Sequence, residues 1–320
     1  MKPLILALLL SSIPAGAVEP IRQLVFVSCF KEQRPAPALE TIAEIKPDVF
    51  IWMGDNVYGD TLDMEVLKGK YQVARENPSY AKIRQTSKIL GTWDDHDLGA
   101  NDAGKEFPKK VESQNLLLDF LDVPATSPRR KQEGVYHVAD FGPPGKMVRV
   151  ILLDTRYFRD PVGSDGEMLG EAQWKWFEKM LVESEAQVNV VVSSIQVLSA
   201  EHRWEKWANF PKEMDRLMKL LARKDVPPVI LLSGDRHVAE ISVDREACAY
   251  PLYDITSSSL NLPLGEGDEA NEKREGRLFR PANFGSLSID WAWEKPVVTA
   301  CIRDADGVPH RAVTLEMGSK

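Results

Sequence analysis

Basic side chains, cysteine and long apolar runs are all scarce in this 320-residue sequence, and each scarcity limits what the protein can be. Its 40 Lys and Arg face 48 Asp and Glu, a net charge of −8. That balance excludes a nucleic-acid or anionic-membrane binder that works by bulk electrostatics, although a local cationic site could still hold an anionic substrate. Hydrophobic residues make up 43% and charged residues 28%, which is ordinary for a folded soluble domain and excludes a disordered chain.

The chain also lacks internal repeats, low-complexity stretches and Gly/Ser linkers. We therefore expect residues 18–320 to form one continuous domain. Only three cysteines are present, an odd number. A disulfide between Cys248 and Cys301 stays open, because the sequence does not show whether the two approach each other.

The most apolar run lies at the N-terminus and has the pattern of a secretory signal. Lys2 gives a basic start, residues 4–10 an apolar stretch, and the small residues that end at Ala17 a cleavage site. The run is too short to remain as a membrane span, and neither a twin-Arg pair nor a Cys for a lipid anchor accompanies it. We expect residues 1–17 to be removed and the protein to be periplasmic or secreted, with no stable membrane anchor.

Alternating strand-like and helix-like segments predict an α/β fold of two mixed β-sheets packed face to face and flanked by helices. The expected helices cover residues 39–45, 62–75, 78–87, 109–121, 170–182 and 211–221. A hairpin is expected over residues 135–153, and residues 188–194 have the Val-rich composition of a strand buried on both faces. Residues 262–283, rich in Gly, Glu, Asn and Arg, are expected to be an exposed loop.

Three apolar, strand-like runs end in side chains that commonly bind metal ions. These segments are residues 49–58, 89–97 and 229–237. The carboxyl ends of buried strands gather at one edge of an α/β fold, so segments that are distant in sequence can build one metal site there. A core strand has no use for such endings, and the sequence therefore predicts metal-assisted chemistry.

Each ending also has an ordinary structural interpretation. Asp55 could cap a turn and Tyr58 could pack in the core, although their spacing in a Gly-bracketed turn lets both reach one ion. The acidic run around Asp95 could be a solvated loop, but its closely spaced carboxylates repel one another unless a cation neutralises them. Asp235 and His237 lie two apart in a segment expected to be extended, which would place both side chains on one face.

Cys29 ends the first expected strand, residues 24–28. An isolated Cys is usually a small buried hydrophobe. At a strand end beside the other clusters, its thiolate would instead be a soft, strongly donating metal ligand.

Together these motifs resemble the alkaline phosphatase D (PhoD-like) branch of the calcineurin-like metallophosphoesterases. The main matches are Gly-Asp-x-x-Tyr, Trp-Asp-Asp-His-Asp and Gly-Asp-Arg-His, and further ones extend from about Ser28 to Thr256. The resemblance implies a hydrolase of small-molecule phosphate esters with a cluster of two or three metal ions. The metal ligands that it implies are Cys29, Asp55, Tyr58, Asp95, Asp235 and His237.

The resemblance also suggests the metal and the groups that would contact the phosphate. It implies a ferric ion bound by Cys29, and it gives His96 the place of a proton donor or phosphate ligand. Independently, only five His are present, and hard phenolate and carboxylate ligands suit Fe³⁺ and Ca²⁺ better than a His-rich zinc pair. Mn²⁺, Mg²⁺ and Zn²⁺ remain alternatives. Arg156 and Arg236 are candidates to offset phosphoryl charge, with a salt bridge equally open for Arg156, and Asn101 is a candidate for a further polar contact.

Three functions stay open for such a site. Phosphate monoesters and diesters are both substrates for a two-metal centre, and a phosphodiesterase or phospholipase-type enzyme is the alternative to a phosphatase. A metal-dependent binding protein without catalysis is a third option, which the complete ligand set disfavours. The oligomeric state stays open as well.

Overall fold

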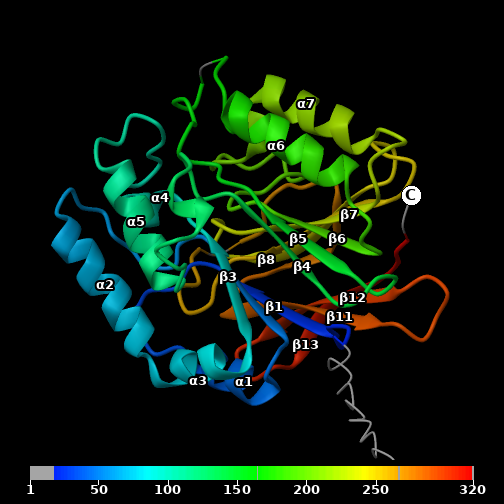
Figure 1. Ribbon diagram of the computed structural model, residues 1–320, viewed down its shortest axis with the longest axis horizontal. Helices are drawn as coiled ribbons and strands as arrows, with labels where there is room; N and C mark the ends of the chain where they lie inside the picture. Colours follow the sequence, from blue (N-terminus) through cyan, green and yellow to red (C-terminus); the bar gives the residue numbers. More distant parts are fainter. Residues whose placement is uncertain (1–17, 164, 266, 319–320) are drawn as a thin grey trace, which may run out of the picture.

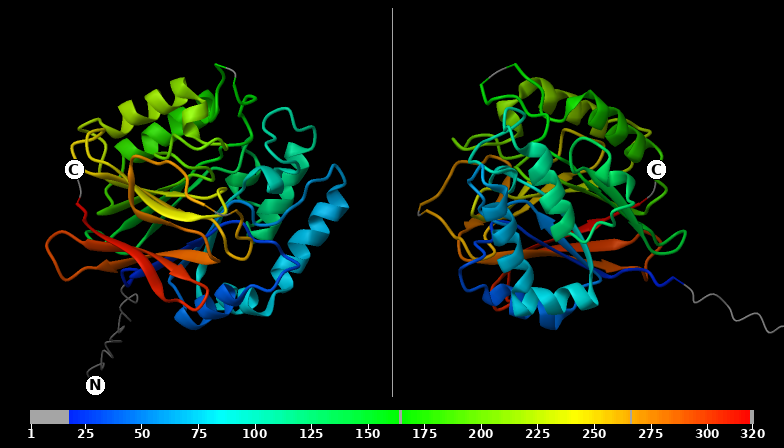
Figure 2. Two further views of the ribbon diagram at one scale, coloured as in Figure 1. Left: turned by 180° about the vertical axis from the view of Figure 1, so that it is seen from behind. Right: turned by 60° about the vertical axis from the view of Figure 1, so that its left-hand side comes forward.

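Two β-sheets packed face to face, with helices on both outer sides, make up the computed structural model (Figures 1 and 2). The structure describes residues 18–163, 165–265 and 267–318, so the expected signal segment lies outside the described residues. The predicted α/β fold with two mixed sheets is confirmed. That residues 18–320 form a single domain stays a prediction.

The first sheet combines three parallel strands with an antiparallel extension. Its strands are β1 (Gln23–Val27), β2 (Val49–Met53), β3 (Lys88–Thr92), β11 (Asn283–Asp290), β12 (Val297–Asp304) and β13 (Pro309–Glu316). They lie in the order β13-β12-β11-β1-β2-β3. β1, β2 and β3 are parallel, so their carboxyl ends lie at the same edge of the sheet.

The second sheet has a parallel centre of β5, β6, β7 and β9, flanked by antiparallel strands. Its strands are β4 (His137–Phe141), β5 (Val148–Leu152), β6 (Val188–Val192), β7 (Val229–Ser233), β8 (Ala239–Asp244), β9 (Leu252–Ser257) and β10 (Arg274–Phe279). They lie in the order β10-β8-β9-β7-β6-β5-β4. The predicted hairpin is formed by β4 and β5, and β6 is buried along its whole length, as its Val-rich sequence predicts.

Helices cover the outer face of each sheet (Figure 1). Those on the side of the first sheet are α1 (Pro37–Ile45), α2 (Met64–Glu76), α3 (Pro78–Thr86), α4 (Asp95–Leu98) and α5 (Lys110–Phe120). Those on the second sheet are α6 (Gly170–Val182) and α7 (Pro211–Leu221). Three apolar layers result, one between the sheets and one beneath each group of helices. Within the described part of the chain, no helix has the length and apolar character that crossing a bilayer needs.

The region expected to be an exposed loop, residues 262–283, contains the edge strand β10, so that prediction is wrong for its second half. β10 pairs with β8 only irregularly, because the register shifts between Glu275 and Phe279. Charged side chains of β10 form ion pairs, such as that of Arg274 with Glu240. An edge strand of charged residues lacks the apolar alternation by which a strand is recognised.

All three cysteines are free thiols. Cys301 lies on β12 of the first sheet, whereas Cys248 lies between β8 and β9 of the second. The disulfide that the sequence left open is therefore not formed.

Candidate metal centre

Four strand ends converge on one buried cluster. Cys29 follows β1, Asp55 follows β2, Asp95 begins α4 just after β3, and Asp235 follows β7. The first three strands are parallel neighbours, and β7 brings the end of the second sheet to the same place. The clusters that the sequence singled out are thus brought together at the strand ends, the usual position of a ligand site in an α/β protein.

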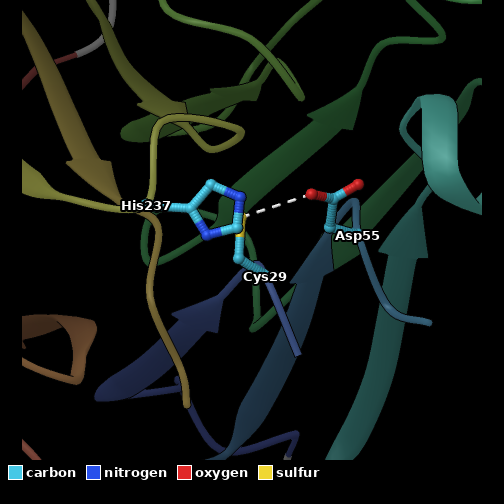
Figure 3. Close-up of side chains that lie close together, drawn as sticks. All are labelled: Cys29, Asp55 and His237. Carbon is cyan, nitrogen blue, oxygen red and sulfur yellow. Dashed lines mark hydrogen bonds between the residues drawn. The ribbon is translucent and has the colours of Figure 1, made fainter. Parts of the chain in front are cut away.

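One half of the cluster combines the thiol of Cys29, the carboxylate of Asp55 and the imidazole of His237 (Figure 3), and the Tyr58 phenol joins them through hydrogen bonds. The Cys29 thiol donates to Asp55 Oδ2 at 3.4 Å, the bond drawn as a dashed line in Figure 3. The Tyr58 hydroxyl donates to the same oxygen at 3.0 Å and lies 3.3 Å from His237 Nε2. All four side chains therefore direct ligand atoms toward one point.

The backbone fixes which nitrogen of His237 is free to bind. His237 Nδ1 lies 2.7 Å from the carbonyl oxygen of Leu262, which can only accept, so Nδ1 carries the proton. Burial lowers the pKa of His237, which favours the neutral ring. The lone pair of Nε2 then faces Cys29 and Asp55, an arrangement typical of a metal-binding histidine.

The other half of the cluster is a group of buried carboxylates. Ligand atoms of Asp55, Asp94, Asp95 and Asp235 lie within 4.8 Å of one another. Burial, reinforced by the neighbouring negative charges, raises the pKa of Asp55 and Asp235 well above the usual range. Asp95 differs, because Arg156 and His96 outweigh the effect of burial and hold its pKa below the usual value.

A bound cation fits this cluster on the evidence of its unpaired oxygens. Asp55 Oδ1 and Asp94 Oδ2 are buried and have no hydrogen-bond partner. Unpaired buried carboxylates are costly, whereas a metal ion supplies both charge and ligation. Among the residues that the structure describes, Asp55 belongs to all three groups of candidate ligands, including the group that it forms with Asp95 and His96. It therefore occupies the position that a bridging ligand would need.

Four of the six expected ligands have a left-handed backbone conformation. Their φ angles are 58° at Cys29, 52° at Asp55, 70° at Asp235 and 55° at His237. Such conformations are strained for non-glycine residues and gather at functional sites. The expectation that Asp235 and His237 share one face of an extended segment is wrong, because β8 begins only at Ala239. The two side chains instead join different groups of ligands, with Asp55 between them.

Arg156, a candidate for a phosphate contact, lies away from the cavity surface. Its side chain is fully buried and does not line the cavity in front of the cluster. Its Nε donates to Asp94 Oδ1 at 2.5 Å, and its Nη1 lies 2.5 Å from Glu205 Oε2. The structure therefore favours the ion-pair alternative, in which Arg156 holds Asp94 in place from behind.

His96, Asn101 and Arg236 do line this cavity, whose volume is about 780 Å³. Asp60 lies 2.6 Å from His96 Nδ1 and orients the ring. Burial alone would lower the pKa of His96, but this hydrogen bond and the charge of Asp95 raise it. Sequence reasoning missed Asp60, which lies only two residues beyond Tyr58 and carried no separate signal.

A second lining segment, residues 202–205, was also missed. It contributes His202, Arg203, Trp204 and Glu205, which follow no apolar strand run and match no motif. The only local signal was a Trp between charged residues.

The model of the PhoD-like phosphatase family matches residues 24–249, most of the chain, and the chain belongs to this family. The predicted family resemblance is thereby confirmed.

Known relatives are similar at low identity. Alkaline phosphatase D of Bacillus subtilis (strain 168) is 21% identical over a match that covers 82% of this chain and 54% of that protein. The chain thus spans about half the length of this relative. A solved structure of PhoD superposes with a TM-score of 0.76 at 16% identity, covering 95% of this chain and 71% of that one. A dimetal phosphatase from Danio rerio gives a TM-score of 0.58 at 12% identity, covering 93% and 99% respectively. These two structures support the fold.

Proposed function

We propose that this protein is a metal-dependent phosphatase that hydrolyses phosphate monoesters, diesters or both. One observation carries the proposal: Asp55 belongs to every group of candidate ligands found among the described residues. The cavity reaches this cluster through Tyr58, Asp95 and Asp235. Metal ions bound there would activate a water molecule and neutralise charge on the phosphoryl group.

The chain's own residues then have separate tasks. Cys29, Tyr58 and His237 would hold one ion, Asp95 and Asp235 another, and Asp55 would bridge them. His96, held by Asp60 at the cavity wall, would donate a proton or a hydrogen bond to the leaving group.

Arg236 would contact the phosphoryl oxygens. It lines the cavity, and Glu269 pairs with one end of its guanidinium. Its Nε is buried and has no hydrogen-bond partner. Arg156 would instead act as a positioning residue through Asp94.

For the metals we propose Fe³⁺ beside Cys29 and Tyr58 and Ca²⁺ on the carboxylate side. The support is chemical: a thiol and a phenol meet on one side of Asp55, and only carboxylates meet on the other. The alternatives are Mn²⁺, Mg²⁺ and Zn²⁺.

Elemental analysis with an optical spectrum tests this assignment. The purified protein is expected to contain iron and to show a visible absorption band from a phenolate bound to Fe³⁺. Tyr58→Phe should abolish the band, whereas Tyr80→Phe should leave it unchanged, because Tyr80 is a buried phenol that packs against Trp52 and Phe120 in the apolar layer beneath the helices. Zinc in place of iron, with no band, would overturn the metal assignment while leaving the hydrolase open.

Hydrolysis itself is tested with p-nitrophenyl phosphate and bis(p-nitrophenyl) phosphate after metal reconstitution. Turnover of the monoester supports a phosphatase, and turnover of the diester alone supports the phosphodiesterase or phospholipase-type alternative. If neither is hydrolysed by a protein that binds metal, the result favours a non-catalytic binding protein over the proposed function.

We also propose export, on the basic, apolar and small-residue pattern that ends at Ala17. The mature protein is then expected outside the cytoplasm with Val18 as its first residue. N-terminal sequencing of protein from the extracytoplasmic fraction checks this. Recovery of an intact N-terminus there would refute cleavage at Ala17.

A further inference from the structure

The cavity lining includes exposed apolar side chains, although the centre of the site is charged. Trp204 is 47% exposed and Leu264 is 52% exposed, and both line the cavity that reaches the carboxylate cluster. Leu262, almost buried, adjoins them in the lining. Exposed apolar side chains are ordinary when scattered, but here two of them face one cavity beside a reactive centre.

Trp204 is fixed to the centre from two directions. The guanidinium carbon of Arg236 lies 5.6 Å from the centroid of the indole ring, and Arg236 separates the candidate ligands Asp235 and His237. On the other side, the next residue, Glu205, is ion-paired with Arg156 behind the cluster. The Trp204 segment is therefore connected to groups that also build the site.

The leucine side of the wall has a comparable anchor. The carbonyl oxygen of Leu262 accepts the hydrogen bond from His237 Nδ1 at 2.7 Å, and the carbonyl of Leu264 accepts from Arg280 at 3.2 Å. The position of this apolar surface is thus linked to the orientation of a metal-binding histidine.

The cations of the wall are largely engaged. Arg236 pairs with Glu269, and Arg280 donates to main-chain carbonyls. Arg203 is exposed, and its guanidinium carbon lies 4.5 Å from the centroid of the Trp204 ring. A planar ligand group could take the place of this exposed side chain on the indole face, because aromatic stacking replaces the cation–π contact.

We propose that Trp204, with Leu262 and Leu264, forms a subsite for a planar aromatic group attached to the phosphate. Esters that carry an aryl or nucleobase substituent would then be preferred over those with a small alkyl group. This inference rests on the proposed function, whose substrate class it narrows.

Diesters that share p-nitrophenol as the leaving group test the subsite, because only the second substituent differs. The substrates are the p-nitrophenyl esters of methyl phosphate, phenyl phosphate and thymidine 5′-phosphate. The wild type is expected to favour phenyl or thymidine over methyl in kcat/KM, and Trp204→Ala to reduce that ratio about tenfold. Trp204→Phe should keep most of the preference. Trp293→Ala is the matched control, since Trp293 is 66% exposed and does not line the cavity.

Binding of unreactive analogues gives a readout that does not depend on turnover. Calorimetry on the metal-loaded protein should show that phenylphosphonate binds more tightly than methylphosphonate, and that Trp204→Ala removes the difference. An equal loss for methyl and aromatic ligands, or no loss, would overturn the subsite while the hydrolase stands. If no ester is hydrolysed but the binding difference persists, the proposed function fails and the subsite remains. A preference for thymidine alone identifies a nucleobase, and an equal preference for phenyl identifies a simple aryl group.

Discussion

Asp55→Asn is expected to lower kcat/KM by about a thousandfold or more, which corresponds to about 4 kcal/mol of transition-state stabilisation. Asp55 belongs to every group of candidate ligand atoms, so the loss of its charge affects all of them. The fold should survive, because Asn has nearly the same shape and still accepts hydrogen bonds from Cys29 and Tyr58. Asn also tolerates the left-handed backbone at this position, where φ is 52°.

In the metal-free protein, Asp55→Asn should reduce the loss of stability that the wild type shows as the pH rises. Burial, with Cys29 and the neighbouring aspartates, raises the pKa of Asp55 well above its usual value of 3.8. The folded state therefore holds this proton more tightly than the unfolded state. The stability from this group is complete below about pH 4 and is lost as the pH rises toward the folded-state pKa. Urea unfolding between pH 4 and pH 8 should show a smaller loss of stability for Asp55→Asn than for the wild type.

Asp122→Asn is the matched control for both measurements. Asp122 also has a left-handed backbone, with φ of 56°, but it is paired with Arg75 and Arg84 away from the cavity. The control should keep full activity and lose at most about 1 kcal/mol of stability, as exposed ion pairs usually do. Undiminished activity in Asp55→Asn would remove Asp55 from the proposed bridging position.

The strand ends of the site could be predicted because adjacent residues in the sequence specify both the strand and the ligand that follows it. A run such as Val49–Met53 is apolar enough to be recognised as a buried strand, and Asp55 follows it directly. Parallel strands then bring such endings together without further information. The two-sheet fold could be predicted for the same reason, since its central strands are continuous apolar runs.

The remaining parts depend on tertiary contacts that leave no local pattern. Arg156 meets Asp94 across 62 residues of sequence, and no spacing rule distinguishes that buried pair from a phosphate contact. The left-handed conformation of His237 is equally hidden. The sequence predicts an extended segment at this residue, whereas β8 begins only at Ala239. Trp204 lines the cavity next to Glu205, whose ion pair with Arg156 joins positions far apart in the sequence. Sequence reasoning thus finds ligands at strand ends and misses the residues that support and surround them.

Arg156→Met is expected to cost about 3–5 kcal/mol in the free energy of unfolding. Arg156 has no exposed surface and pairs with both Asp94 and Glu205. Met fills much of the volume but leaves these carboxylates buried without their partner. The pKa of Glu205 is already raised by burial, which Arg156 and Arg159 only partly offset, so losing Arg156 makes its ionised form still more costly. Chemical denaturation at neutral pH measures the effect.

Arg149→Met provides the comparison, because Arg149 forms a two-pronged ion pair with Asp140 that is partly exposed. Water can solvate the carboxylate left behind, and a loss of at most about 1 kcal/mol is expected. A double-mutant cycle with Glu205→Gln then separates charge from packing. If the buried pair is the cause, the double variant should be more stable than the sum of the single losses predicts, because it removes both charges together. Additive losses, or equal losses for Arg149→Met and Arg156→Met, would show that Arg156 acts through its volume and not through its charge.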